Sequence, residues 1–216
     1  MAETVLVIGN KAYSSWSLRP WLALKLTGQP FREVVIPIRT PETKARILEH
    51  SPAGKVPVLK QDGLTVWDSL AICEYLAERH PQAGLWPAEE GARALARSVA
   101  AEMHSGFQDL RSNLFMDLKQ RRDHPDRVEK AAGDIRRIQE LWADCRSRYG
   151  AGGPFLFGTF GIADCFYAPV CTRFVTWGVE LSAGAQAYVD AVLAHPFMRE
   201  WTESALAEEW VIDFGI

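Results

Sequence analysis

No stretch of this sequence is apolar for long enough to cross a membrane or to direct secretion. The longest apolar stretch near its start, residues 5–9, falls far short of the roughly 20 residues that a membrane-spanning helix needs. No basic residue precedes that stretch, as one would in a signal peptide. We therefore expect the chain to remain in the cytoplasm and to have no membrane partner.

An excess of positive charge is also lacking. Lys and Arg number 24 against 27 Asp and Glu, which gives a net charge of -3. Nucleic acids and anionic lipids bind proteins through broad positive surfaces, so the sequence argues against a nucleic-acid partner. A small molecule or another protein is the expected partner.

Cysteine is scarce and is not paired along the chain. No Cys-x-x-Cys spacing occurs, and that spacing is typical of redox dithiols and zinc ribbons. In a reducing compartment, free cysteines pack as small hydrophobic residues. We therefore predict reduced, buried thiols and no metal site. The cysteines are Cys73, Cys145, Cys165 and Cys171.

The first eighty residues alternate between strand-like and helix-like patterns. Short β-branched runs bounded by turn residues predict strands, whereas leucines at helical spacing predict helices. The predicted strands span residues 4–8, 31–38, 56–59 and 64–67, and the predicted helices span 15–26, 41–50 and 69–80. This order, βαβ, α, ββα, is that of a thioredoxin-like α/β domain.

Residues 81–91 have the composition of a linker, with two prolines, two glycines and no periodicity. Beyond them the hydrophobic period is helical throughout. The expected organisation is a thioredoxin-like domain at 1–80, a linker at 81–91 and an all-helical domain at 92–216. The helices predicted in the last domain span residues 92–119, 125–149, 161–177, 183–194 and 196–207.

Two serines stand where the first polar loop enters the first helix. Ser14 and Ser15 lie in the segment Tyr-Ser-Ser-Trp-Ser-Leu-Arg. A helix N-terminus carries partial positive charge and unpaired N–H groups, so it favours an anion. A thiolate is such an anion, and a serine hydroxyl can donate a hydrogen bond to it. The alternative is that Ser14 or Ser15 only caps the helix.

A Lys-Val-Pro segment, residues 55–57, leads into the third strand, where thioredoxin-like folds carry a cis-proline. A cis peptide bond before Pro57 is energetically tolerable. It would turn the backbone N–H and C=O of Val56 toward a cleft, where they could pair in β-fashion with the cysteinyl residue of a tripeptide. The alternative is an ordinary trans-proline at the start of a strand.

An acidic residue and a serine open the third helix. The carboxylate of Asp68 can hold an amino group and the hydroxyl of Ser69 can hold a carboxylate, so the pair suits the α-amino-acid end of a ligand. Helix capping by Asp68 is the alternative. Each of these three signals is weak alone, but their order and spacing are together specific.

These segments together resemble the cytosolic glutathione S-transferases, and the first domain is most similar to the zeta class. Residues 14–19, with a downstream Ala-Leu pair, resemble the zeta signature Ser-Ser-Cys-x-x-Arg. Residues 69–76 match the segment that follows the family's acidic-Ser pair, and residues 158–164 resemble the capping motif of the helical domain. The likeness covers about residues 4–180.

The resemblance implies the fold of that family and a serine-type glutathione site. It makes Ser14 the hydroxyl that stabilises the thiolate of glutathione, with Ser15 as the neighbouring candidate. The other contacts that it implies are to the backbone of glutathione, by Lys55, Val56 and Pro57, and to its γ-glutamyl end, by Asp68 and Ser69.

Two positions depart from the zeta pattern. Trp16 replaces the cysteine of the signature, which argues against zeta-type redox side activity and would crowd the pocket for an electrophile. Gly161 stands where a capping Ser or Thr is usual, so Asp164 must support that turn alone.

The electrophilic second substrate is expected between the domains, beside the first part of the long helix. Arg173 lies near the place where zeta enzymes carry a cation for an acidic substrate. The resemblance also implies a homodimer. The residues predicted for the electrophile pocket are Trp16, Met103, His104, Phe107, Arg111 and Arg173.

Three functions remain as hypotheses. The first is a glutathione transferase, whose activated thiol attacks a small electrophile. The second is a zeta-type maleylacetoacetate isomerase, which uses glutathione as a cofactor by addition and elimination. The third is a non-catalytic module that keeps the fold for protein binding. The segments at Ser14, Val56-Pro57 and Asp68-Ser69 argue against the third, because a scaffold has no physical need for all of them.

Overall fold

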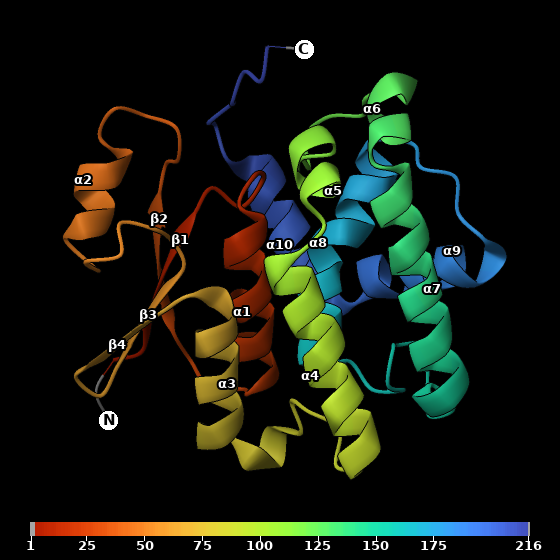
Figure 1. Cartoon of the computed structure of the whole chain (residues 1–216). Helices are drawn as coiled ribbons and strands as arrows, with labels where there is room; N and C mark the ends of the chain where they lie inside the picture. Colours follow the sequence, from red (N-terminus) through yellow and green to blue (C-terminus); the bar gives the residue numbers. More distant parts are fainter. Residues whose placement is uncertain (1–2, 216) are drawn as a thin grey trace.

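The computed structural model describes residues 3–215, which form an α/β domain followed by an all-helical domain (Figure 1). The predicted thioredoxin-like order of the first domain is confirmed. Its elements are β1 (Val5–Gly9), α1 (Ser15–Leu26), β2 (Arg32–Ile36), α2 (Thr43–Leu48), β3 (Val58–Gln61), β4 (Leu64–Trp67) and α3 (Ser69–Arg79). A short 3₁₀ turn, η1 (Pro81–Ala83), leads toward the second domain.

The four strands form one mixed sheet in the order β2-β1-β3-β4. β1 runs parallel to β2, with Val7 opposite Val34, and β3 is antiparallel to both β1 and β4. A parallel pair needs a crossover connection, which α1 provides. β3 and β4 are joined by the turn at Asp62 and Gly63, which both have positive φ. β1, one of the two interior strands, is followed by the loop that carries the two serines.

The two faces of the sheet pack against different partners. Alternate residues of a strand point to opposite faces. Val5 and Val7 of β1 share a buried cluster with Ile47 of α2, whereas Leu6 and Ile8 lie in the main core with α1 and α3. Figure 1 shows α2 on one side of the sheet, and α1 and α3 on the other.

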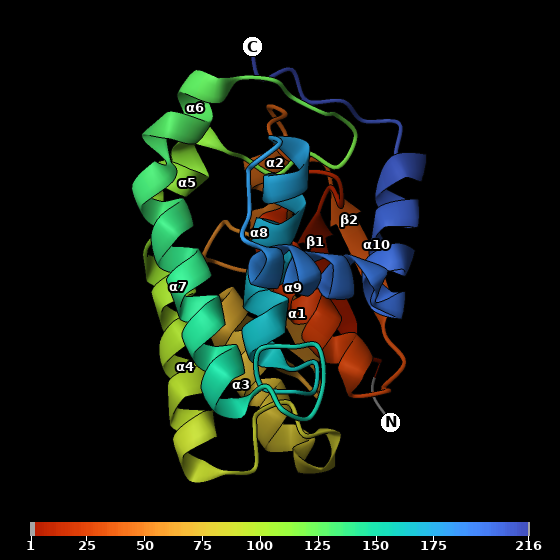
Figure 2. The same cartoon turned by 90° about the vertical axis from the view of Figure 1, so that its right-hand side faces the viewer.

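The helical domain is built around α8, which lies alongside α1 and behind α9 in Figure 2. Nearly every residue of α8 is buried, as expected for a helix that other helices surround. One buried core includes residues of both domains. The helices are α4 (Glu90–Ser105), α5 (Gln108–Asn113), α6 (Pro125–Lys130), α7 (Ala132–Tyr149), α8 (Ile162–Thr176), α9 (Ala183–Ala194) and α10 (Pro196–Ala207).

A buried carboxylate holds the N-terminus of α8. Asp164 accepts hydrogen bonds from the N–H of Gly161 over 2.9 Å, from the N–H of Leu156 over 3.1 Å and from the hydroxyl of Tyr188 over 3.0 Å. Burial raises the pKa of Asp164 to about 6 although these donors oppose the change. Gly161 has no side chain to contribute, so Asp164 supports this turn as the sequence predicts.

The prediction of a single helix over residues 92–119 is wrong. α4 ends at Ser105, Phe107 adopts a left-handed conformation with a φ of 60°, and the short α5 follows as a separate helix. The guanidinium of Arg111 turns back and donates to the carbonyl oxygen of Gly106 over 2.9 Å. Such a side chain satisfies carbonyl groups that the end of a helix leaves unpaired, and so it stabilises the break.

Two further bounds differ from the prediction. The helix predicted over residues 125–149 is divided into α6 and α7 at Ala131, whose φ of -95° and ψ of 2° leave the helical region. The strand predicted at residues 56–59 begins later, at Val58. Pro57 has no N–H to donate to a strand ladder, which explains the later start.

Residues 3–215 contain no helix that is long and apolar enough to cross a membrane. The same part of the chain holds no group of three or more His, Cys, Asp or Glu side chains that could hold a metal ion. All four cysteines are free and buried, as the sequence predicts.

Candidate functional site

A cleft of about 740 Å³ lies where the loop before α1, the segment before β3 and the start of α3 come together. These segments meet because the sheet places β1 beside β3 and β3 beside β4. His104 of α4 adds a side chain from the helical domain. The predicted site residues that line this serine cleft are Ser14, Ser15, Trp16, Lys55, Val56, Pro57, Asp68, Ser69 and His104.

Ser14 precedes α1, but its side chain does not cap the helix. Its hydroxyl donates to Oγ of Ser17 over 2.7 Å. Oγ of Ser17 also accepts a hydrogen bond from the backbone N–H of Gly9 over 3.1 Å. The packing is close, since a β-carbon on Gly9 would lie 3.1 Å from Oγ of Ser14. The capping alternative therefore does not hold for Ser14, which is tied to the end of β1 instead.

Ser15 is the first residue of α1 and is linked to the helical domain. Its Oγ accepts a hydrogen bond from Nη2 of Arg173, a residue of α8, over 3.0 Å. Both side chains are buried, since 4% of Ser15 and 5% of Arg173 is exposed. Burial, together with the like charge of Arg111, lowers the pKa of Arg173 to about 9.

Three arginines gather around Ser15 and Trp16. The guanidinium carbon of Arg19 lies 4.4 Å from the centre of the Trp16 ring, and that of Arg111 lies 4.6 Å from it. Burial lowers the pKa of Arg19, and repulsion from Arg111 and Arg173 adds to this effect. Among the described residues, Nε and Nη1 of both Arg19 and Arg173 have no hydrogen-bond partner. The protein beneath the serine loop is thus positively charged.

The start of α3 offers a carboxylate and a hydroxyl to the cleft. Asp68 caps α3, because its Oδ1 accepts from the N–H of Leu70 over 2.9 Å and of Ala71 over 3.2 Å. The hydroxyl of Ser69 is buried and finds no hydrogen-bond partner within residues 3–215. An unpaired buried hydroxyl costs free energy, so Ser69 can gain a bond from a ligand.

His104 lies between Asp68 and Trp16. Its Nε2 is 3.3 Å from Oδ2 of Asp68, and the ring of Trp16 meets it edge-on with the ring centres 5.4 Å apart. Burial lowers the pKa of His104 from its usual 6.5, Arg19 and Arg111 lower it further, and Asp68 opposes them. His104 is consequently neutral at pH 7 and leaves the charge of Asp68 uncompensated.

Comparison with known proteins assigns this chain to a family. The model for the glutathione S-transferase N-terminal domain matches residues 13–79, and the model for the glutathione S-transferase C-terminal domain matches residues 120–204. The chain belongs to the glutathione S-transferase family. The two matched ranges include every predicted site residue except Met103, His104, Phe107 and Arg111.

Individual relatives agree with this assignment. Over 111 residues the chain is 42% identical to maleylacetoacetate isomerase from Rhizobium meliloti, a match covering 47% of this chain and 49% of the relative. Over 109 residues it is 36% identical to a protein named "Probable maleylacetoacetate isomerase" from Caenorhabditis elegans, covering 50% of each. The chain thus spans about half the length of these relatives.

Solved glutathione S-transferase structures share the fold. A sphingomonad glutathione S-transferase complexed with glutathione superimposes with a TM-score of 0.70 at 24% identity, over 94% of this chain and all of the other. The similarity at this level of identity concerns the fold of the two domains, which is the fold that the sequence predicts.

The remaining predicted site residues do not line the serine cleft. Met103 is fully buried in the core, and Phe107 is 7% exposed beyond the end of α4. A step of one residue turns a helical side chain by about 100°, so His104 faces the cleft while Met103 faces the core. Arg111 packs against the ring of Trp16 and Arg173 donates to Ser15, and neither arginine lines the cleft.

Sequence reasoning missed several residues of the site. Arg19 follows Trp16 by three positions, which places both on one helix face, and this spacing could have revealed the stacked pair. Ser17 carried a similar signal beside Ser14. The cleft residues that no motif indicated are Tyr13, Ile38, Ile47, Ala53, Gly54 and Trp67.

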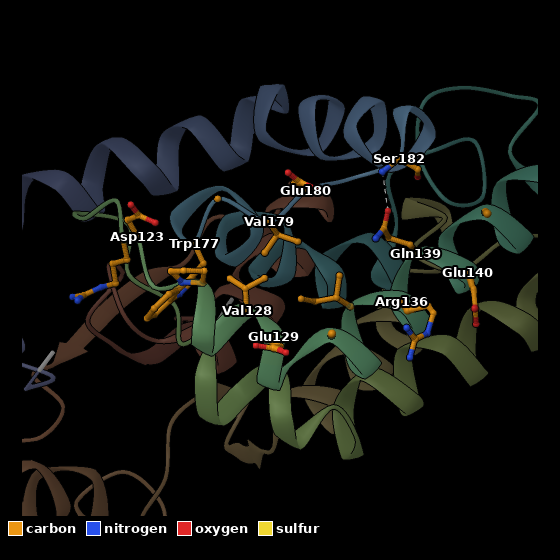
Figure 3. A pocket seen from close by; sticks show the side chains of 16 residues that line it. Asp123, Val128, Glu129, Arg136, Gln139, Glu140, Trp177, Val179, Glu180 and Ser182 are labelled. Carbon is orange, nitrogen blue, oxygen red and sulfur yellow. Dashed lines mark hydrogen bonds between the residues drawn. The ribbon is translucent and has the colours of Figure 1, made fainter.

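A larger cavity of about 930 Å³ lies elsewhere in the helical domain, between α6, α7 and the segment after α8 (Figure 3). Val128, Trp177 and Val179 give it an apolar lining, and the charged groups around it, such as Glu129 and Arg136, are exposed. It shares no lining residue with the serine cleft. Arg122, which also lines it, is paired with the buried carboxylate of Asp117 over 2.7 Å.

Proposed function

We propose that this chain is a glutathione transferase, which binds glutathione in the serine cleft and activates its thiol for attack on a small electrophile. One observation carries the proposal. A single cleft joins a serine backed by a buried guanidinium to a carboxylate and an unpaired hydroxyl at the start of α3. A tripeptide with a thiol and an α-amino-acid end requires these two sets of groups.

The groups at the start of α3 suit the γ-glutamyl end of glutathione. The carboxylate of Asp68 attracts the α-ammonium group, and the hydroxyl of Ser69 donates to the α-carboxylate. The backbone of Val56 pairs with the cysteinyl residue in β-fashion, beside Pro57, and Lys55 contacts the peptide backbone. The peptide bond between Val56 and Pro57 is cis, which is one of the two alternatives that the sequence left open.

The chemistry requires a lower thiol pKa. A cysteine thiol with a pKa near 8.5 is only a few per cent ionised at neutral pH. Lowering that pKa by about two units takes roughly 2.7 kcal/mol, and one charge-assisted hydrogen bond together with a helix N-terminus supplies an amount of that size. The thiol proton goes to solvent, and the thiolate then attacks an electrophilic carbon.

Titration of glutathione into the protein tests this proposal. Calorimetry measures binding, and the ultraviolet absorbance of the thiolate across pH measures the pKa of the bound thiol. We expect binding at or below millimolar glutathione, with a bound thiol that ionises below the pKa of the free thiol. S-methylglutathione is the matched control, because it binds in the same way but has no thiol to ionise.

Absence of binding at millimolar glutathione would contradict the catalytic proposal and would favour the non-catalytic binding module. Binding without any change in the thiol pKa would leave a glutathione-binding protein that does not activate its ligand. The two measurements therefore separate recognition of glutathione from its activation.

A second candidate function is a glutathione-dependent maleylacetoacetate isomerase. The names of the two relatives support it, whereas Arg173, the cation expected for its acidic substrate, donates to Ser15 and does not line the cleft. Conversion of maleylacetoacetate with catalytic amounts of glutathione would establish this function. Conjugation of a simple electrophile without isomerisation would exclude the isomerase and would leave transferase activity as the function.

The resemblance also predicts a homodimer. The outer strand β4 carries two large apolar side chains, Leu64 and Trp67, which are 53% and 47% exposed in the single chain. An interface that covers them would remove apolar surface from water. Sedimentation velocity should give twice the mass of one chain, and a monomer at micromolar concentration would contradict this expectation.

A further inference from the structure

Two serines compete for contact with the thiolate, and the hydrogen bonds around them differ. We infer that Ser15 donates the hydrogen bond that stabilises the glutathione thiolate and that Arg173 of α8 is the positioning residue that holds Ser15 for this purpose. The inference rests on the proposed glutathione transferase function and names the groups that perform its first step.

The hydroxyl of Ser14 is already used inside the protein. It donates to Ser17 Oγ over 2.7 Å, and Ser17 is itself held by the backbone N–H of Gly9. To donate to the thiolate, the hydroxyl of Ser14 would have to give up this buried bond. Replacing one hydrogen bond by another yields little net free energy. Ser14 therefore serves to fix the loop at the end of β1.

The hydroxyl of Ser15, in contrast, accepts a hydrogen bond within the protein and, among the residues that the structure describes, does not donate one. A guanidinium can only donate hydrogen bonds, so Arg173 makes Ser15 Oγ an acceptor and leaves the Ser15 proton for another partner. In the described part of the chain, that hydroxyl donates to no other group. A thiolate is an acceptor without a proton to give, and hence it complements Ser15 in this arrangement.

The charge of Arg173 also needs an anion. The guanidinium is 5% exposed, and it forms no ion pair within residues 3–215. The charges that act on it are those of the other two cations, Arg19 and Arg111. A buried cation without a counter-charge is costly, so this group favours a negative charge on the far side of Ser15. The bound thiolate supplies that charge.

The arrangement makes the catalytic loop depend on the helical domain. Ser15 and Arg173 are 158 positions apart in the chain, and they meet because α1 packs along α8. A domain that ended at residue 80 would retain every predicted glutathione contact but would lose the cation behind Ser15. Binding and activation of glutathione therefore depend on different parts of the fold.

Four variants test the inference through the pKa of glutathione bound to the whole protein. We expect Ser15→Ala to bind glutathione and to raise the bound thiol pKa by about one to two units, with a smaller change in Ser14→Ala. Arg173→Gln should raise the pKa to a similar extent, and Arg173→Lys, which keeps the charge, should restore part of the difference.

The double variant Ser15→Ala/Arg173→Gln separates positioning from general stability. If Arg173 acts mainly through Ser15, adding Arg173→Gln to Ser15→Ala raises the thiol pKa by less than Arg173→Gln does alone, since coupled residues are not additive. Arg146→Gln is the control for loss of one positive charge, because Arg146 lies on α7, does not line the serine cleft and donates to the carbonyl of Gly184.

Three results would overturn the inference. Ser14→Ala could raise the thiol pKa more than Ser15→Ala does, the two single shifts could add in the double variant, or Ser15→Ala could leave the pKa unchanged. A wild-type protein that binds no glutathione would instead remove the proposed function itself, and the inference with it. Should Arg173→Gln fail to fold, Ser15→Ala and Arg173→Lys still decide the outcome.

Discussion

The charge state of single side chains sets what the cleft can bind. Asp68 must carry its negative charge to attract the α-ammonium group of glutathione, yet His104 lies 3.3 Å away. A protonated His104 would compete for the same carboxylate. Burial of the imidazole, together with Arg19 and Arg111, lowers its pKa and prevents this competition at neutral pH.

The state of His104 gives a pH-dependent prediction. Its pKa in the folded protein lies below the ordinary 6.5 of the unfolded chain, so folding favours the neutral form. The resulting stability is complete above pH 6.5 and is lost as the pH falls through the folded pKa. The free energy of unfolding of the wild type, relative to His104→Gln, should therefore decline only below about pH 6.5.

NMR titration of the imidazole resonances measures the pKa of His104 directly, and His104→Gln assigns the resonance. Chemical denaturation of both proteins across pH supplies the stability difference. A His104 pKa at or above 6.5 would contradict the prediction, as would a stability difference that grows when the pH falls.

For single residues, the sequence indicated several side chains that line the cleft, but it did not indicate the contacts that these side chains make with the helical domain. Ser14, Lys55 and Asp68 sit in short segments whose order along the chain identifies the family, and all three line one cleft. The link between Ser15 and Arg173 could not be predicted, because no local pattern reports which residue of a distant helix meets a given loop. Only the packing of α1 on α8 creates it.

The elements show a similar division. The helices predicted at residues 183–194 and 196–207 have the observed bounds, because Ser182 caps the first and Pro196 begins the second. The predicted helix over 92–119 was wrong since its apolar stripe continues beyond the break after Ser105. Periodicity indicates which residues are buried. It does not indicate that the side chain of Arg111, which lies beyond α4, binds the carbonyl oxygen at the end of that helix.

The segment after α10 is the element that we expect to steady the serine loop. The carboxylate of Glu208 accepts hydrogen bonds from the backbone N–H of Lys11 over 2.7 Å and of Ala12 over 3.2 Å. Further along, the ring of Phe214 stacks on Phe115 with the ring centres 3.8 Å apart. The end of the chain thus holds the loop that leads to Ser14.

Glu208→Ala should release this loop without unfolding the protein. Two backbone donors lose a charged acceptor, so we expect about 1–3 kcal/mol of local destabilisation and faster hydrogen exchange of the amides in residues 10–14. The affinity for glutathione should fall while the fold is kept. Hydrogen exchange read by mass spectrometry, with calorimetry of glutathione binding, makes the comparison.

Glu209→Ala is the matched control for this experiment, because Glu209 is the adjacent exposed carboxylate. Equal exchange of residues 10–14 in the two variants would show that the hydrogen bonds of Glu208 do not restrain the loop. Protection that is lost throughout the sheet would mean that the contact supports the whole domain.

At the scale of the molecule, the two domains share one core. Leu18 and Leu22 of α1 belong to the same buried cluster as Phe166 and Val170 of α8. Polar contacts cross the boundary as well, since the indole N–H of Trp201 donates to the carbonyl of Lys11 over 3.0 Å. Apolar surface that only the partner domain covers would be exposed if either domain unfolded alone.

This shared core predicts that the two domains unfold together. Chains of more than about 150 residues often unfold through intermediates, so a single transition here would reflect the contact between α1 and α8. We expect amides of β1 to β3 and amides of α8 to lose protection from hydrogen exchange at the same urea concentration. Arg173→Gln should shift both midpoints by the same amount, because the bond to Ser15 crosses the boundary. Separate midpoints for sheet and helices would instead describe two independent domains, and the cation behind Ser15 would then be supplied only when they dock.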